Sequence, residues 1–244
     1  MTVRLQDVTK KFGRHVVLDR VSFDVPQATA CCILGRSGTG KSVTLKHIIG
    51  LLKPDAGHVF VYDEDVPTLN SRELTRVRKR IGFLFQNAAL FDSISVGENV
   101  AFPMRRHTKL SDGEIRDRVR QKLESVGLGG EEDKMPADLS GGMRKRAGLA
   151  RAMSLDPPLL LVDEPSAGLD PITSGEIDDL LLRLKQDQHT TLIVVTHNIP
   201  SARTIGDELL MLHDGRILAR GTADELSASD NPFVRTFMTS TGGG

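Results

Sequence analysis

One octapeptide constrains this chain more than any other feature of its sequence. Residues 35–42 read Gly-Arg-Ser-Gly-Thr-Gly-Lys-Ser and match the pattern G-x-x-x-x-G-K-[ST]. The glycines let successive backbone N–H groups turn inward into a concave anion site, and a following helix adds the positive end of its dipole. Lys41 supplies a mobile cation for β- and γ-phosphates, and Ser42 offers a hydroxyl to Mg²⁺. The octapeptide therefore predicts a phosphate-binding loop rather than an ordinary glycine-rich turn.

The flanking residues predict where this loop lies in the fold. Ala30–Leu34 is a short apolar run, as expected of a strand buried on both faces, and residues 43–49 have apolar residues at helical spacing. Because strands and helices alternate on both sides of residues 87–158, the sequence predicts a mainly parallel α/β core with an inserted helical lobe. Further strands are expected in residues 1–25, 58–62, 81–85, 159–162, 191–196, 208–212 and 216–220, and helices in 71–80, 111–127, 143–155 and 175–186.

Composition excludes several classes of protein. The 244 residues include 32 basic and 32 acidic residues, and this zero net charge argues against a surface built as a whole for nucleic acid. The apolar stretches fall far short of the roughly 20 residues that span a bilayer, and the N-terminus has no signal-peptide core. The two cysteines, Cys31 and Cys32, are adjacent and lack metal-ligand spacing, so we expect buried thiols in a cytoplasmic protein.

A second group of polar residues follows two other apolar runs. Leu159–Val162 leads into Asp163 and Glu164, and Thr191–Thr196 leads into His197. Nucleotide sites in such sheets lie at the carboxyl ends of the strands. There an Asp can hold Mg²⁺ through its water shell, a Glu can orient or deprotonate an attacking water, and a His can contact a γ-phosphate. The alternatives are an ordinary acidic turn and a structural histidine.

The order of six motifs indicates a family. After the phosphate loop come Gln86, Leu-Ser-Gly-Gly at 139–142, Asp163-Glu164, Ser-Ala-Gly-Leu-Asp at 166–170, and His197. Over about residues 2–222, the chain resembles the ATPase subunits of ABC transporters. The resemblance implies an ABC-type P-loop NTPase of the α/β class, with a mainly parallel core sheet, an antiparallel β subdomain and an inserted helical subdomain. The implied domains are a discontinuous ATP-binding core of residues 1–86 and 159–222, a helical signature subdomain of residues 87–158, and a C-terminal tail of residues 223–244.

The resemblance implies a role for each matching residue. Glu164 would be the general base or water-positioning carboxylate, and His197 the γ-phosphate sensor. Gln86 would act in catalysis and, with Ser42, ligate Mg²⁺, while Asp163 would hold the ion through water. Phe12 matches the aromatic that stacks on adenine, where Tyr is commoner; a core or edge-strand Phe is the alternative. The other residues expected to contact ATP are Gly35, Arg36, Ser37, Gly38, Thr39, Gly40, Lys41, Val43, Ser140, Gly141, Gly142 and Asp170.

The Leu-Ser-Gly-Gly motif implies that the active unit contains two copies of the chain. A Ser-Gly-Gly turn that opens a helix at residue 143 points N–H groups and a dipole at an anion. In the family, residues 140–142 close on the nucleotide held by a second copy, so the resemblance implies a head-to-tail homodimer around two ATP molecules. The sequence departs from the common pattern at Met143, where Gln is frequent, and at Arg36, where Pro is frequent.

A narrower resemblance concerns what is transported. Residues 85–100 and 139–151 are similar to the ATPases of Mce-type lipid traffic systems, the Mla group. Those ATPases work with a membrane permease and Mce-domain proteins to move phospholipid between bacterial membranes, on the cytoplasmic face of the inner membrane. No nucleic-acid partner is expected. The ATPase of a small-solute importer, and a soluble ABC ATPase such as an iron–sulfur assembly scaffold, remain alternatives.

Two basic runs, one apolar pair and the chain end allow less specific interpretations. The run within residues 72–80 is expected on a solvated helix face. For residues 144–146 a solvated face and a functional role are equally open, the role being support of the ATP site or contact with anionic lipid headgroups. Leu90 and Phe91 would either meet the permease or pack inside the helical lobe. Residues 239–244 are expected to fray.

Overall fold

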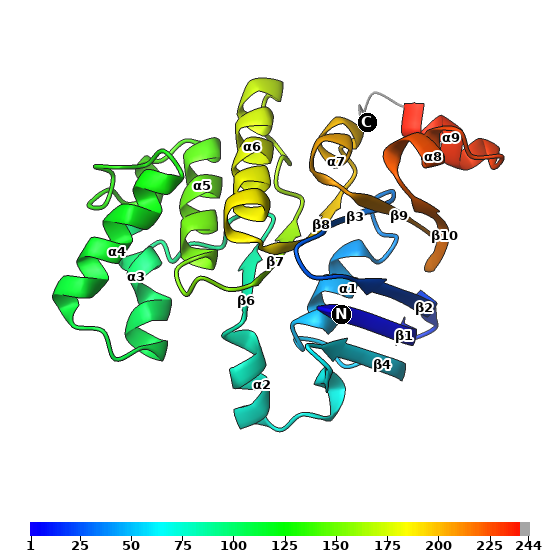
Figure 1. Ribbon diagram of the computed structural model, residues 1–244, viewed down its shortest axis with the longest axis horizontal. Helices are drawn as coiled ribbons and strands as arrows, with labels where there is room; N and C mark the ends of the chain where they lie inside the picture. The colour runs from blue at the N-terminus through cyan, green and yellow to red at the C-terminus, as the bar shows by residue number, and fades with distance from the viewer. Residues whose placement is uncertain (240–244) are drawn as a thin grey trace.

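The computed structural model describes residues 1–239 and divides their strands between two sheets (Figure 1). The six-stranded sheet has the order β10-β9-β3-β8-β7-β6, and the four-stranded sheet has the order β2-β1-β4-β5. In the larger sheet, parallel pairing joins β3 (Ala30–Leu34), β6 (Ile81–Leu84), β7 (Leu159–Asp163), β8 (Thr191–Thr196) and β9 (Glu208–His213), and β10 (Arg216–Gly221) pairs antiparallel with β9. The smaller sheet is antiparallel and contains β1 (Val3–Phe12), β2 (His15–Val25), β4 (Ala56–Val61) and β5 (Glu64–Asp65). The predicted α/β fold, with a mainly parallel core sheet and an antiparallel sheet beside it, is confirmed.

The central strands are buried on both faces, as their continuous apolar runs predict. Every residue of β3, β7 and β8 is buried. Successive side chains of a strand point to opposite faces, so Cys32 packs in one hydrophobic core and Cys31 in the other. The two thiols are free and buried, and burial raises the pKa of Cys32 to about 12. The expectation of buried strand thiols is therefore confirmed.

Each face of the larger sheet has its own covering layer. On one face, α1 (Lys41–Ile48) contributes Leu45 and Ile48 to a core that it shares with the four-stranded sheet. On the other face, α6 (Pro171–Gln188) and α7 (Ile199–Ile205) contribute Ile177, Leu181 and Ala202. These two layers hold the β3–α1 connection in place, so the phosphate loop starts from a rigid strand and ends in an anchored helix.

Three helices between β6 and β7 lie together beside the β6 end of the larger sheet (Figure 1). They are α3 (Val96–His107), α4 (Asp112–Ser125) and α5 (Gly141–Ala152). Each begins after a serine, Ser95, Ser111 or Ser140, whose hydroxyl accepts a backbone N–H of the first turn. Their buried faces join the same core as α6, through residues such as Met104, Leu123 and Leu149.

Several element boundaries differ from the sequence predictions. Helix α3 was not expected as a helix, because Gly97 and Pro103 interrupt its pattern. Helix α5 begins at Gly141 rather than residue 143, directly after its cap, and ends at Ala152. Helix α6 begins at Pro171 rather than residue 175 because Asp170 caps it. Helix α2 spans Ser71–Arg78, close to the expected range, and short 3₁₀ turns lie at Val66–Thr68 and Pro136–Asp138.

The C-terminal segment forms two short helices, α8 (Ala223–Ser227) and α9 (Pro232–Thr239). Leu226, Val234 and Met238 are buried in the same hydrophobic core as residues of α6 and α7. Thr239 is the last residue of α9, so the predicted fraying does not hold there, and residues 240–244 lie outside the described residues. None of the helices in residues 1–239 combines the length and the apolar character that crossing a lipid bilayer requires.

Candidate functional site

The register of the parallel strands brings the predicted site residues to one edge of the sheet. Leu34 pairs with Thr196, and Asp163 pairs with Val195, so the three strand ends lie in line. A cavity of about 730 Å³ opens at this edge. Its lining includes most of the predicted residues: Phe12, Arg36, Ser37, Gly38, Gly40, Lys41, Ser42, Val43, Gln86, Glu164 and His197. His15, Val17 and Phe237 also line it and were not predicted.

The phosphate loop has the backbone that its glycines predict. Gly40, which precedes α1, has φ +102°, and a Cβ there would lie 2.8 Å from the Val17 carbonyl oxygen, so only glycine fits. The buried Lys41 ammonium donates to the carbonyls of Gly35 at 2.7 Å and Arg36 at 3.0 Å. Thr39 Oγ1 donates to the same Arg36 carbonyl at 2.9 Å. Gly35 and Thr39 therefore shape the loop, while Lys41 places a cation at its centre.

Three oxygen-bearing side chains lie where the resemblance implies a magnesium site. Ser42 Oγ donates to Asp163 Oδ1 at 2.8 Å, and Gln86 lines the same cavity as Ser42. Burial raises the pKa of Asp163, and the hydrogen bond from Ser42 works in the opposite direction. Hydroxyl, amide and carboxylate oxygens are the ligands that Mg²⁺ uses in proteins. These three side chains therefore fit the ion.

The Glu164 carboxylate lies between two nitrogen-bearing side chains. Its Oε1 is 3.5 Å from Lys41 Nζ, and its Oε2 is 2.9 Å from His197 Nδ1. The backbone N–H of His197 also donates to Oε2, at 3.3 Å. Glu164 is buried, whereas the His197 side chain is about half exposed. This arrangement can place a carboxylate beside a phosphate held by Lys41, which is the position that a water-orienting base needs.

An exposed aromatic lies at the mouth of the cavity. Phe12 ends β1 opposite His15 in the β1–β2 hairpin, and 49% of its surface is exposed. Lys10 Nζ lies 5.6 Å from its ring centroid. Phe12 is therefore not a core residue, and its exposed ring could stack on a base.

The C-terminal helix also contributes to the cavity, which the sequence analysis did not predict. Phe237 of α9 lines it, and the Arg36 guanidinium lies 5.6 Å from the Phe233 ring centroid. The signal was present in the spacing of α9, because Phe233 and Phe237 share one helix face while Val234 and Met238 form the buried face.

The Leu-Ser-Gly-Gly motif at residues 139–142 does not line this cavity. Ser140 caps α5, its Oγ accepting from Met143 N–H at 3.2 Å. Asp170 Oδ1 accepts the N–H groups of Ile172 and Thr173, each at 3.0 Å, and so caps α6. The two helix starts pack together, because a Cβ on Gly142 would lie 2.5 Å from Thr173 Cγ2. Residues 140–142 and Asp170 thus form a separate surface of the chain.

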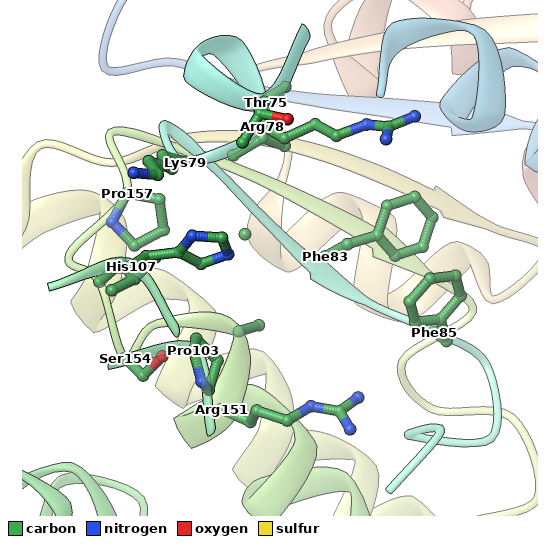
Figure 2. Close-up of a pocket in the computed structure, with 14 residues that line it drawn as sticks. Thr75, Arg78, Lys79, Phe83, Phe85, Pro103, His107, Arg151, Ser154 and Pro157 are labelled. Carbon is green, nitrogen blue, oxygen red and sulfur yellow. The ribbon is translucent and has the colours of Figure 1, made fainter. Parts of the chain in front are cut away.

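A second cavity, of about 390 Å³, lies among α2, β6, α3 and α5 (Figure 2). Figure 2 shows His107 pointing into it, with the rings of Phe83 and Phe85 side by side; their centroids are 4.1 Å apart. Burial, together with the nearby positive charges of Lys79 and Arg106, lowers the pKa of His107. Lys79 and Arg151 lie on opposite sides of the cavity (Figure 2), which thus combines an aromatic wall with a basic rim. We call it the lobe groove.

Arg151 connects the lobe groove to the segment after Gln86. Its guanidinium donates to the carbonyls of Ala88 at 2.9 Å and Ala89 at 2.7 Å, and both alanines have positive φ. Beyond them, 46% of Phe91 is exposed, and its ring lies 5.0 Å from that of the exposed Phe102. Leu90 packs partly buried against the helical core. Of the expected apolar pair, only Phe91 is therefore exposed.

The two basic runs differ in how deeply their members are buried. In the first, Arg76 pairs with Glu64 at 2.7 Å, Arg78 donates to the carbonyls of Ile49 and Gly50, and the Arg80 guanidinium lies 3.6 Å from the Tyr62 ring centroid. In the second, Arg144 donates to the Leu139 carbonyl and Arg146 to Glu176. The remaining member, Lys145, is buried and donates to the backbone of Glu164. Arg72, Arg76, Lys79 and Arg80 are exposed, as expected of a solvated face, whereas Arg78 is partly buried.

Comparisons with known proteins agree with this geometry. The family profile described as ABC transporter matches residues 18–167. The chain is 43% identical over 238 residues to a "Probable ribonucleotide transport ATP-binding protein mkl" of Mycobacterium leprae, covering 98% of this chain and 69% of that protein. It is 41% identical over 236 residues to the "Intermembrane phospholipid transport system ATP-binding protein MlaF" of Escherichia coli, covering 97% of this chain and 88% of that protein.

A solved structure extends the comparison to the fold. An ATP-binding cassette, described as a dimeric post-hydrolysis state bound to ADP and Pi, matches with a TM-score of 0.84 and 34% identity, covering 90% of this chain and 98% of that chain. Profile, relatives and structure agree with the order of motifs around the cavity. The chain therefore belongs to the ABC transporter family, as one of its ATP-hydrolysing, ATP-binding subunits.

Proposed function

We propose that this chain binds MgATP beside its phosphate loop, hydrolyses it in a head-to-tail dimer, and thereby drives a membrane permease that carries phospholipid between bacterial membranes. The observation that carries the proposal is the position of Glu164, held between the phosphate-loop lysine and His197. Burying a carboxylate costs free energy, and a buried carboxylate in the wall of a cavity is therefore typical of a functional residue. It is suited to orienting water against a terminal phosphate.

The residues around the cavity divide the chemistry among them. A bound triphosphate would accept the Lys41 donors that now serve two loop carbonyls, and the N-terminus of α1 would face the same charge. Ser42, Gln86 and Asp163 would hold Mg²⁺, which neutralises phosphate charge. His197 would contact the γ-phosphate, and Phe12 would stack on adenine. The phosphate-loop residues from Gly35 to Val43 would hold the phosphates through backbone N–H groups.

A second copy of the chain would complete each site. Residues 140–142 open α5 but lie outside the cavity lining, so their N–H groups are available to a nucleotide held elsewhere. Asp170 lies at the start of α6, against that same turn. We infer that this surface closes on the ATP of the partner copy, and the description of the solved relative as a dimer bound to ADP and Pi supports this inference.

The dimer and the role of Glu164 can be tested together. The Glu164→Gln variant should bind MgATP and accumulate as a dimer in light scattering, yet hydrolyse ATP at least about a hundredfold more slowly than wild type, because a neutral amide is too weak a base to take a proton from water. Glu124→Gln, on the exposed face of α4, is the matched control and should behave as wild type. Wild-type turnover by Glu164→Gln would overturn the assignment.

The permease would engage the lobe groove. The groove lies beside the segment that follows Gln86, and Arg151 bonds two carbonyls of that segment. In ABC transporters this region of the ATPase subunit meets the membrane subunit. A permease element seated against Phe83, Phe85 and the exposed Phe91 could therefore shift Gln86 at the nucleotide cavity. The subunit would then be peripheral, on the cytoplasmic face of the inner membrane.

Phospholipid is the proposed cargo because of the relatives named MlaF. Those of Escherichia coli and Haemophilus influenzae are 41% and 42% identical to this chain and are aligned over 97% of it. The mycobacterial relatives, at 43% identity, are named for ribonucleotide transport, so a small polar solute is the second candidate. The alternative of an ABC ATPase outside transport has no such relative among these names.

The cargo proposal predicts which proteins co-purify with this chain and which compound stimulates ATP hydrolysis by the complex. The tagged chain, purified from detergent-solubilised membranes, should bring a multispanning permease and Mce-domain proteins, identified by mass spectrometry. ATP hydrolysis by this complex in liposomes should respond to phospholipid and not to added ribonucleotide. Stimulation by ribonucleotide alone would favour the second candidate, and the absence of any membrane protein would overturn both.

A further inference from the structure

Lys145 is a buried cation in the signature helix α5. Only 6% of its surface is exposed, and its Nζ donates to the backbone carbonyl oxygen of Glu164 at 3.0 Å. Burial lowers the pKa of Lys145, while the charges of Asp163 and Glu164 act in the opposite direction. A lysine is rarely buried without a partner that requires it. The partner here is the peptide group of the proposed catalytic residue.

The backbone of Glu164 needs such support. Its φ is +47°, a left-handed conformation that is unfavourable for a residue with a side chain. Contacts hold the residue on both sides, because its N–H donates to the Val195 carbonyl at 2.9 Å and its carbonyl accepts from Lys145. With both peptide groups fixed, the side chain can reach Lys41 on one side and His197 on the other.

We infer that Lys145 is a positioning residue for ATP hydrolysis, which holds Glu164 in the conformation that aims its carboxylate into the nucleotide cavity. The inference rests on the role proposed above for Glu164. It adds a contact between the two halves of the chain, because Lys145 belongs to the helical segment and Glu164 follows a core strand.

The same contact joins two surfaces that act on different nucleotides. Helix α5 begins at Gly141, within the turn proposed to close on the ATP of the partner copy. Lys145 lies one turn further along this helix and bonds the backbone of Glu164, a residue of the nucleotide cavity in its own chain. A movement of α5 as the dimer closes therefore reaches the Glu164 carbonyl directly, so that hydrolysis in one site depends on how the signature turn of the same chain is seated.

The flanking basic residues do not share this position. Arg144 donates to the Leu139 carbonyl, and Arg146 pairs with Glu176 at 3.1 Å on a partly exposed surface. They have the same charge and lie on the same helix, but neither forms a hydrogen bond or ion pair with Glu164 among the described residues. Arg146 therefore provides a matched control for substitution of Lys145.

The test is a separation of kcat from KM. In Lys145→Met the methylene stem stays and the donor is lost, so kcat should fall by about tenfold or more while KM for ATP stays within about twofold. Lys145→Arg, which keeps a donor, should recover most of the rate, and Arg146→Met should resemble wild type. A residue with only a structural role would lower the melting temperature without this selective loss and rescue.

The outcomes distinguish the inference from the function on which it rests. Lys145→Leu, which is smaller and also lacks a donor, replaces Lys145→Met if the latter does not fold. Wild-type kcat in these variants, or a raised KM with unchanged kcat, would overturn the role of Lys145. If Glu164→Gln is inactive in the same assay, the proposed role of Glu164 still stands. If Glu164→Gln itself turns over normally, the proposed role of Glu164 fails, and the inference fails with it. ATP-dependent dimerisation of the Lys145→Met, Glu164→Gln double variant should persist.

Discussion

Replacing Arg151 by Met tests the connection between the lobe groove and the segment that carries Gln86. The guanidinium donates two hydrogen bonds, to the carbonyls of Ala88 and Ala89, and Ala88 is 1% exposed. Hydrogen bonds to charged groups contribute about 1.5–3 kcal/mol each, or about 3–6 kcal/mol for the two. Met also removes the cost of partly burying the guanidinium charge, so we expect a net loss of about 2–4 kcal/mol in the free energy of unfolding. In a chain of this size, that lowers the melting temperature by roughly 4–16 °C.

Calorimetry and chemical denaturation measure this loss, and an exposed arginine provides the control. Within residues 1–239, Arg120 on α4 forms a single ion pair, with Asp117 at 3.7 Å, and both side chains are exposed, so Arg120→Met should change stability by less than about 0.5 kcal/mol. Arg151→Met should still bind ATP, because the phosphate loop does not touch this cluster, but its hydrolysis should respond less to the permease. A variant as stable as wild type, with full response to the permease, would refute the connection.

Three further predictions concern the cavity and a buried carboxylate. Lys41→Met removes the loop cation, so ATP affinity measured by titration calorimetry should fall at least about tenfold; unchanged affinity would contradict the phosphate-loop assignment. Phe237→Ala opens one wall of the nucleotide cavity, so KM for ATP should rise about two- to tenfold with kcat unchanged, and a selective loss of kcat would contradict this. Burial raises the pKa of Asp178 from 3.8 to about 6, so its charged form destabilises the folded state as pH rises through this interval. Asp178→Asn should therefore raise the free energy of unfolding by about 1–3 kcal/mol at pH 8 and by almost nothing below pH 4, and an equal gain at both pH values would contradict the cause.

Local patterns predicted the parts of the fold that depend on short segments. The octapeptide at 35–42 requires a strand before it and a helix after it, and both are present as β3 and α1. The buried runs at 159–162 and 191–196 correspond to β7 and β8. In each case hydrophobic continuity over a few residues was sufficient, because such strands are buried on both faces.

Other features depend on distant residues and could not be derived in the same way. The position of β3 between β8 and β9 is set by pairing across more than a hundred residues of sequence. Helix α3 forms despite Gly97 and Pro103 because Ser95 caps it and Met104 packs in the lobe core. Tertiary packing therefore outweighed local propensity there.

In the candidate site, too, local motifs predicted some residues, while others depend on how distant segments pack. The motifs placed Lys41, Glu164 and His197 in one cavity, as the parallel register explains. They did not reveal Phe237, which reaches the cavity from the chain end, or the buried position of Lys145 within a run of three basic residues. Charge alone cannot distinguish which member of such a run turns inward, since that depends on the orientation of α5 against β7.

The most direct test of the account is transfer of labelled phospholipid by the complex of this chain with its membrane partners, reconstituted in vesicles, with wild type and Glu164→Gln compared. We predict MgATP-dependent transfer with wild type, and none above the nucleotide-free background with Glu164→Gln, although that variant still binds ATP. Equal transfer by the two proteins would contradict the proposal that hydrolysis at Glu164 drives transport. ATP-dependent movement of ribonucleotide without any movement of lipid would contradict the proposed cargo.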